Sequence, residues 1–143
     1  MNISTKTRYG FRLMIYLGLN HSENGSIQLG EIADKENISF KYLEKIVQML
    51  KRSGLVSVKR GPKGGYRLMR PAENILLLDI YECLEGSSSV IGCVDNDMCD
   101  QNSSCTTISL WRGLTDVIKN FFSTQTLADI ISEYQDKNHM FYI

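Results

Sequence analysis

The sequence predicts a mostly α-helical protein with one small β-hairpin. Two features carry this prediction: several segments repeat apolar residues at the helical spacing of three and four, and one glycine-rich stretch is flanked by short runs of alternating apolar and polar residues. At 143 residues, the chain has the length of one domain with a small extension. No stretch approaches the roughly 18 apolar residues of a membrane helix.

Two helices are expected at the N-terminal end. The first spans residues 6–20, and its apolar residues share one helical face: Tyr9, Leu13, Tyr16 and Leu17. Residues 22–26 form a polar loop. Leu29, Ile32 and Ala33 then open a short second helix, which is expected to end at Asn37.

A third helix carries the clearest pattern. We expect Ser39 to cap its start and Ser53-Gly54 to end it. One face is apolar and is expected to be buried: Leu43, Ile46, Val47 and Leu50. The opposite face is polar and mostly basic: Lys41, Glu44, Lys45, Gln48 and Arg52.

A hairpin is expected directly after this third helix. Val56 and Val58 alternate with polar residues in the first strand, and Tyr66 and Leu68 do so in the second. The six residues between them, 60–65, form a flexible basic tip. Three helices and a hairpin in this order make a winged helix-turn-helix.

The second half is expected to be helical around a polar loop. A fourth helix contains Leu77, Ile80 and Leu84 and ends at Gly86, and residues 87–105 form the loop. A long helix at 107–122 has a wide apolar stripe: Trp111, Leu114, Val117, Ile118, Phe121 and Phe122. A short last helix, capped by Thr126, is expected to reach Tyr134 and to leave 135–143 as a tail.

Charge is divided unevenly along this neutral chain. Residues 1–70 contain 13 Lys and Arg against 5 Asp and Glu, a net charge of +8, whereas 71–143 contain 3 against 11, a net charge of −8. A basic half predicts a polyanionic partner. The basic and then apolar start could also be a signal peptide, but its apolar core at 13–19 is short and lacks a cleavage site, so a cytoplasmic protein is expected.

We expect the basic half to bind double-stranded DNA, because a helix-turn-helix places its second helix in the major groove. The alternative is a solvated charged face without DNA. Glu44 could accept a hydrogen bond from a cytosine amino group, or could only stabilise its own helix. The expected DNA-binding residues lie at the start of the first helix, on the third helix and at the hairpin tip: Lys6, Arg8, Ser39, Lys41, Tyr42, Glu44, Lys45, Arg60, Gly61, Lys63, Gly64 and Gly65.

The apolar helix at 107–122 needs a second surface. It could pack within its own monomer, but we favour a homodimer in which it pairs with its mate. A two-fold dimer reads half-sites one helical turn of about 34 Å apart, or multiples of it, so the expected operator is near-palindromic. The chain then divides into a DNA-binding domain (1–70), a connecting helix with a cysteine loop (71–105), and a dimerisation helix, short helix and tail (106–143).

Three segments resemble the Rrf (type two) family of bacterial winged-helix transcriptional regulators, the IscR/NsrR/CymR group: STKTRYGFRLMIYL, ISFKYLEKIVQMLKRSGLV and RGPKGGYRL. The resemblance runs along nearly the whole chain and includes LWRGL in the long helix. It implies a dimeric DNA-binding regulator that acts mainly as a repressor. It also implies DNA contacts from Ser39, Lys41, Tyr42, Glu44, Arg60 and Lys63 through Gly65.

Three of the four cysteines are evenly spaced. Cys93, Cys99 and Cys105 are separated by five residues each, within the polar loop. Zinc sites usually contain CxxC pairs, which are absent, so three thiolates on one loop favour an iron–sulfur cluster. A thiol switch and idle cysteines are the alternatives. Cys83 faces the apolar side of the fourth helix and is expected to be a core thiol.

The resemblance implies a cluster as well, because the cysteine spacing is similar to that of cluster-binding members, in which the cluster alters DNA binding. A [2Fe–2S] cluster is favoured over [4Fe–4S]. The fourth ligand is unassigned, because Ile108 stands where some members have a histidine and Arg8 where others have an acidic residue. The remaining candidates are Asp95, Asp97, Asp100, Ser104, Cys83 and a small external ligand.

The chain ends in apolar residues that could pack on their own dimer or bind another protein. The ending MFYI is similar to that of the family's cysteine-metabolism repressor. That similarity implies that Phe141, Tyr142 and Ile143 bind cysteine synthase, a pyridoxal-phosphate enzyme, with the terminal carboxylate imitating the substrate carboxylate.

Two regulatory functions therefore compete: a repressor that senses an iron–sulfur cluster or redox status, and a regulator of cysteine and sulfur metabolism controlled by cysteine synthase. A third class, an iron–sulfur carrier or electron-transfer protein, would leave the basic hairpin without a purpose. An enzyme is not expected, because His21 and His139 lie in a loop and a tail and no nucleophile–base pair or phosphate loop is visible.

Overall fold

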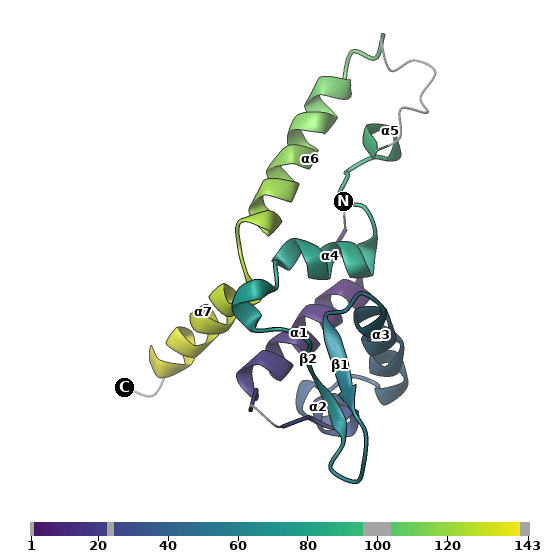
Figure 1. Cartoon of the computed structure of the whole chain (residues 1–143). Helices are drawn as coiled ribbons and strands as arrows, with labels where there is room; N and C mark the ends of the chain where they lie inside the picture. The colour runs from purple at the N-terminus through teal and green to yellow at the C-terminus, as the bar shows by residue number, and fades with distance from the viewer. Residues whose placement is uncertain (1, 23–24, 96–103, 141–143) are drawn as a thin grey trace.

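The computed structural model describes residues 2–22, 25–95 and 104–140 (Figure 1). Three helices and a hairpin form a winged helix-turn-helix, and a long helix projects away from it (Figure 1), which confirms the predicted fold class. The elements are α1 (Thr5–Leu19), α2 (Leu29–Glu36), α3 (Phe40–Arg52), β1 (Val56–Lys59), β2 (Gly65–Leu68), the 3-10 turn η1 (Ala72–Asn74), α4 (Leu77–Glu85), α5 (Gly92–Asp95), α6 (Ile108–Ser123) and α7 (Leu127–Met140). Every helix in these ranges is too short or too polar to cross a membrane.

The residues that the sequence suggests as helix ends are the ends in the structure. Asn37 follows α2 in the left-handed conformation, with φ of 52°, and Gly54 does the same after α3 with φ of 71°. Ser39 stands at the N-cap position of α3, although its side chain makes no capping hydrogen bond. These residues end helices because asparagine and glycine tolerate the left-handed region better than other residues.

The hydrophobic core lies between α1, α3 and α4. All four apolar residues predicted for the third helix are at most 1 % exposed: Leu43, Ile46, Val47 and Leu50. Helices α1 and α4 approach closely at Gly10, because a Cβ there would collide with the Leu84 side chain. Each buried leucine or isoleucine stabilises such a core by about 1.5–3 kcal/mol.

The wing is held by a third short segment. Strands β1 and β2 pair antiparallel, with Val56 opposite Leu68 and Lys59 opposite Gly65. The backbone of Ile27 exchanges two hydrogen bonds with Tyr66, of 2.9 and 2.8 Å. The segment between α1 and α2 therefore adds one bridge to the sheet, and this supports a hairpin that would be marginal by itself.

Helix α7 is longer than the sequence analysis predicts. It continues to Met140 instead of ending at Tyr134, so the predicted tail from 135 and the placement of His139 in a tail are wrong. Nothing stops the helix at Tyr134, because the following residues contain no glycine or proline, and Lys137 and His139 suit the negative end of the helix dipole. Its predicted start is confirmed, since Thr126 Oγ1 accepts a hydrogen bond from Asp129 N at 3.3 Å.

The predicted polar loop at 87–105 contains a helical turn. Helix α5 includes Cys93, and its first turn is closed by a 3.2 Å hydrogen bond from Val94 N to the Ile91 carbonyl. The Asp95 carboxylate accepts a hydrogen bond from the Ser89 hydroxyl. Four residues form one turn, which is too short to produce a recognisable periodicity in the sequence.

Helix α6 leaves most of its apolar stripe uncovered. Thr115 is the only buried residue of this helix, whereas Val117 is 65 % and Phe121 is 55 % exposed. Helix α6 contacts α4 and α5, whereas α4 and α7 both pack on α1. The divisions predicted after residues 70 and 105 stay predictions.

Candidate nucleic-acid interface and cysteine segment

The outward face of α3 is charged along its N-terminal half. Lys41, Glu44 and Lys45 are all exposed, and their spacing of three and four residues places them side by side on the helix. Phe40 stands beside them with half of its surface exposed. The sequence pattern does not single out Phe40, because an apolar residue at the start of an amphipathic helix usually belongs to the core.

Helix α3 is held against α1 by aromatic and ionic contacts. The rings of Tyr9 and Tyr42 meet edge to face with centroids 5.8 Å apart. Arg12 lies over the Tyr9 ring at 5.6 Å and forms a 2.8 Å ion pair with Glu36. Tyr42, a predicted DNA contact, is therefore half-buried, and its ring also positions the recognition helix.

The wing tip is exposed and built on glycine. Arg60, Gly61 and Lys63 are exposed, and Gly61 has φ of 115°, a conformation that other residues rarely adopt. Gly64 N donates a 2.9 Å hydrogen bond to the Gly61 carbonyl. The Ser26 hydroxyl donates to the Lys63 carbonyl at 3.0 Å, so the tip is also tied to the segment before α2.

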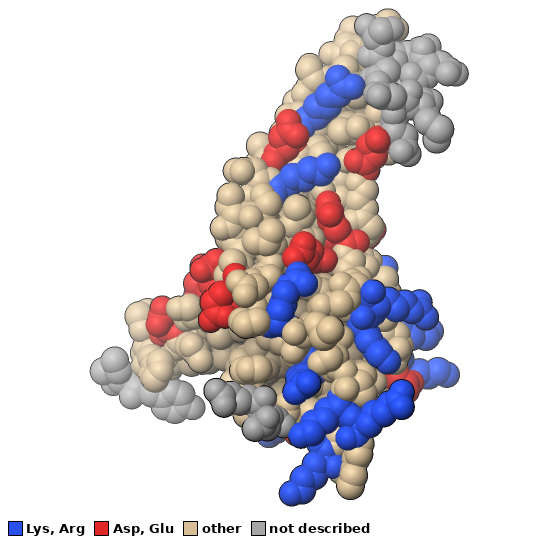
Figure 2. All heavy atoms as spheres, viewed as in Figure 1, with Lys and Arg blue, Asp and Glu red and all other residues tan. Residues whose placement is uncertain are grey.

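Basic side chains gather over one end of the molecule. Figure 2 shows Lys and Arg concentrated over the helix-turn-helix and the wing, whereas Asp and Glu lie towards α4, α6 and α7. This distribution follows the division of charge along the sequence. The recognition helix and the wing tip therefore lie within one positive surface, which attracts a polyanion.

Two of the predicted DNA contacts belong to α1 and not to α3 or the wing. Lys6 is half-buried and near the Glu85 carboxylate. Arg8 donates a 3.0 Å hydrogen bond to Thr5 Oγ1, and it lines a groove to which neither α3 nor the wing contributes. Partial burial opposes ionisation of Glu85, but hydrogen bonds from Ser4 outweigh it and lower the Glu85 pKa.

The groove beside Arg8 is apolar and has a volume of about 620 Å³. It runs between α1, α4, α6 and α7, and its floor includes Phe11, Tyr81 and Phe122. The Tyr81 and Phe122 rings stack with centroids 4.7 Å apart. The groove is continuous with the uncovered stripe of α6 through Phe121, so the two form one apolar surface.

Two of the three clustered cysteines lie in described parts of the chain. Cys93 is on α5 and Cys105 comes just before α6; both are half-buried free thiols, and α5 packs against α6. Hydrogen bonds from the Thr107 hydroxyl and backbone, and from Ile108 N, lower the pKa of the Cys105 thiol. A lowered pKa favours the thiolate, which is the form that binds metal.

The other predicted ligands are only partly described. Cys99, Asp97 and Asp100 lie outside the described residues. Hydrogen bonds from Ser87 and Ser89 lower the pKa of Asp95. In the described ranges, no three His, Cys, Asp or Glu side chains stand close enough to hold a metal ion. The donor chemistry still fits a soft metal, because Cys93 and Cys105 are free thiols on either side of the segment that contains Cys99.

Cys83 lies at a different place from the cysteine segment. It packs against the hydrophobic core as a half-buried side chain of α4, and its sulfur accepts a 2.9 Å hydrogen bond from the Ser53 hydroxyl at the end of α3. It is thus a thiol at the edge of the core, beside the recognition helix. The predicted partner-binding residues Phe141, Tyr142 and Ile143 lie outside the described residues.

Comparison with known proteins gives consistent matches along the chain. Residues 3–133 match the Rrf2 family model, described as an iron-dependent transcriptional regulator. The transcriptional regulator IscR of Photorhabdus laumondii is 33 % identical over 135 residues, which cover 94 % of this chain and 82 % of that protein. The structure of CymR, named as the global cysteine regulator of B. subtilis, has a TM-score of 0.77 and 35 % identity, covering 93 % of this chain and 98 % of that one. T. potens IscR has a TM-score of 0.75 and 29 % identity, with coverages of 96 % and 90 %.

Proposed function

The chain belongs to the Rrf2 family of transcriptional regulators, and we propose that it is a dimeric repressor that reads a near-palindromic operator and senses iron–sulfur or redox status. It is a DNA-binding regulator of the IscR and CymR type and not an enzyme. The observation that carries the proposal is the single positive surface shared by the exposed face of α3 and the wing tip.

We assign two kinds of DNA contact to this surface. Lys41, Lys45 and the wing residues Arg60 and Lys63 are exposed cations suited to phosphates, and the glycines of the tip let backbone approach the duplex. Glu44 lies between two lysines on α3, where a carboxylate is costly beside phosphates unless it accepts from a base. Lys6 and Arg8 remain candidates for backbone contacts in a dimer.

A salt titration of DNA binding separates these roles. Lys41→Ala should weaken binding to operator and random DNA alike and should lower the salt slope by about one, because one phosphate contact is lost. Glu44→Ala should instead narrow the preference for operator over random DNA by roughly tenfold, the discrimination of one base contact. If Glu44→Ala weakened the affinity for operator and for random DNA by the same factor, Glu44 would contact no base.

Dimerisation is proposed from the uncovered stripe of α6. Leu110, Leu114, Val117 and Phe121 are exposed along the helix and continue into the apolar groove beside Phe11. A contiguous apolar surface of this kind is unusual on a monomer. A second copy of α6 and its groove would cover it symmetrically, and the two recognition helices would then read two half-sites.

The cysteine segment is proposed to hold an iron–sulfur cluster through Cys93, Cys99 and Cys105. The family is described as iron-dependent, and the two described thiols are free and partly exposed. When bound, the cluster would supply a redox-sensitive group next to α6. The Thr107 hydroxyl lies 3.5 Å from the Cys105 sulfur and would be next to the cluster.

Anaerobic purification tests this assignment. The wild-type protein should be coloured and should contain iron and sulfide in equal amounts, and Cys93→Ala should lose the colour. The matched control is Cys83→Ala, which should leave the colour unchanged, since Cys83 lies on α4 and contacts Ser53 at the end of α3. Colourless wild-type protein that takes up no iron on reconstitution would contradict the cluster.

A second candidate function is regulation of cysteine metabolism. It is favoured by the likeness to CymR, at 35 % identity and a TM-score of 0.77. In this alternative, cysteine synthase would bind the terminal residues 141–143, and deletion of Ile143 would abolish that binding. Co-purification of the intact chain and of the deletion variant with cysteine synthase distinguishes the two functions.

A further inference from the structure

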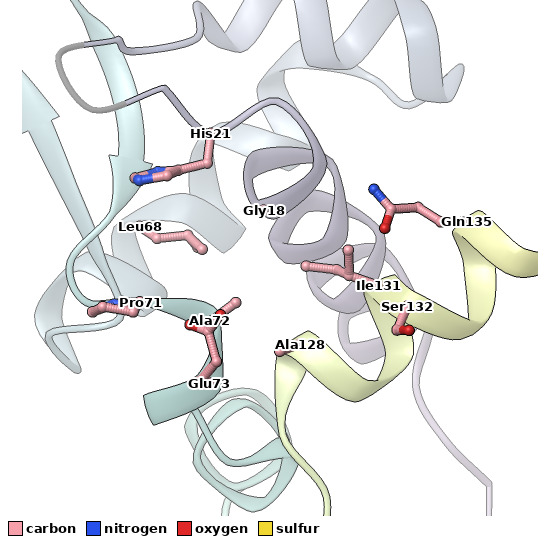
Figure 3. Close-up of a pocket in the computed structure, with 10 residues that line it drawn as sticks. All are labelled: Gly18, His21, Leu68, Pro71, Ala72, Glu73, Ala128, Ile131, Ser132 and Gln135. Atoms are coloured by element: carbon pink, nitrogen blue, oxygen red, sulfur yellow. The ribbon is translucent and has the colours of Figure 1, made fainter.

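A separate cavity lies where α7 meets the base of the wing. Its volume is about 310 Å³, and it is enclosed by the ends of α1 and β2, the turn η1 and one face of α7 (Figure 3). Small-molecule sites have volumes from about 300 Å³ upwards and occur where separate elements meet. It shares no lining residue with the apolar groove beside α6.

The cavity has an apolar floor. Leu68, the last residue of β2, and Ile131 of α7 face it from two sides in Figure 3, with Gly18 of α1 between them. A Cβ at Gly18 would collide with the Ile131 side chain, so α1 and α7 are already in close contact there. The floor is therefore built by packed elements, and it can take an apolar group without rearrangement.

The rim of the cavity is polar. His21 lies on the side of the wing, and Ser132 and Gln135 lie on α7 (Figure 3). Glu73 of η1 is the one acidic residue among the described residues that line the cavity, and lysine and arginine are absent from them. This charge balance favours a cation and disfavours an anion.

We propose that this cavity binds a small organic amine, whose apolar body lies on Leu68 and Ile131 and whose ammonium group faces Glu73. The ligand would contact the end of a wing strand and α7 together. Any effect of the ligand on DNA binding rests on the proposed function, but binding itself does not.

Amide NMR spectra of the full chain without DNA test the proposal, with cyclohexylammonium as the probe and cyclohexanol and cyclohexanecarboxylate as matched neutral and anionic analogues. The ammonium should shift the signals of Gly18, Ala72 and Gln135 saturably. Cyclohexanol should bind roughly two- to fivefold more weakly, since an exposed ion pair contributes little more than that, and the carboxylate should bind most weakly.

Two variants localise the interaction. Glu73→Gln should remove the difference between the ammonium and cyclohexanol, whereas Asp34→Asn, an exposed charge on α2, which contributes no residue to the cavity, should preserve it. Ser132→Phe, at an exposed position of the rim, should block binding without changing signals from the core. The proposal is overturned if no analogue gives saturable shifts at tens of millimolar, if the shifts map elsewhere, or if the two charge variants behave alike. None of these results bears on DNA binding.

Discussion

Helices α3 and α6 are both amphipathic, but only α3 has its apolar face buried within the chain. The four apolar residues of the α3 core face are at most 1 % exposed, and the polar side chains opposite them point to solvent. Helix α6 shows the reverse: only Thr115 is buried, and Leu114, Val117 and Phe121 are exposed. An amphipathic pattern shows that a face will be covered, but it does not show whether the cover comes from the same chain.

We propose that this difference reflects different partners for the two helices. The apolar face of α3 is covered by its own chain, so its exposed charged side chains are available to contact DNA. The apolar stripe of α6 is exposed, and the groove beside it is open above a floor of half-buried Phe11 and Phe122 and buried Tyr81. Three predictions test this difference between α3 and α6.

The largest effect is expected from a charge placed in the middle of the α6 stripe. Val117→Asp should raise the dimer dissociation constant by at least about 100-fold, because a carboxylate without a partner would be buried at the interface. Operator binding should weaken with it. Sedimentation velocity across a range of protein concentrations measures the change.

The matched control for this variant is Asn120→Asp, which adds the same charge at an exposed polar position of α6. It should leave the dimer intact. If the two variants sediment alike, the apolar stripe of α6 is not the dimer interface and the contrast with α3 fails.

A medium effect should distinguish buried from exposed leucines. Leu50→Ala in α3 should cost about 2–5 kcal/mol of unfolding free energy at any protein concentration, because it opens a cavity in the core. Leu114→Ala in α6 should destabilise the protein only at concentrations at which the dimer forms. Urea unfolding at two concentrations separates them. A concentration-independent loss for Leu114→Ala would place this side chain in the core of the monomer.

The smallest effect is expected at the junction between α6 and α7. Asp129 accepts hydrogen bonds from Thr126 N at 2.8 Å and from the Thr126 hydroxyl at 2.9 Å, which lower its pKa. A carboxylate with a lowered folded-state pKa stabilises the fold above its unfolded pKa, and it loses this contribution as the pH falls through the folded value.

Asp129→Ala should therefore lower the Tm slightly at neutral pH, and the difference from wild type should vanish in acid. Thermal unfolding followed by circular dichroism measures it, with Asp136→Ala, in the same helix, as the control. A difference between wild type and Asp129→Ala that persists unchanged at low pH would mean that the carboxylate does not cap α7.

The sequence predicts best what is decided locally. The ends of α2 and α3 follow from Asn37 and Gly54, whose backbone preferences act whatever surrounds them. The bridge between Ile27 and Tyr66 is not visible in the sequence, because it joins residues far apart along the chain. The sequence pattern also does not predict that Arg8 lines an apolar groove, because a basic residue near a DNA-binding motif is expected to contact DNA.

The length of α7 and the turn at α5 were missed for a related reason. Residues 135–140 are nearly all polar and were assigned to a tail, but a helix continues through polar residues when nothing interrupts it. The cavity at the base of the wing is made by four separate segments, and only their packing brings Leu68 and Ile131 together.

The tie between the wing and the segment before α2 limits how this regulator can respond to a signal. Ser26 and Ile27 hold the hairpin at the Lys63 and Tyr66 backbones, so the wing is fixed to the segment directly before α2. If the proposed cysteine segment transmits a signal to the proposed dimer, we expect that signal to rotate the two DNA-binding domains relative to each other. Such a rotation would change the separation of the half-sites that they read.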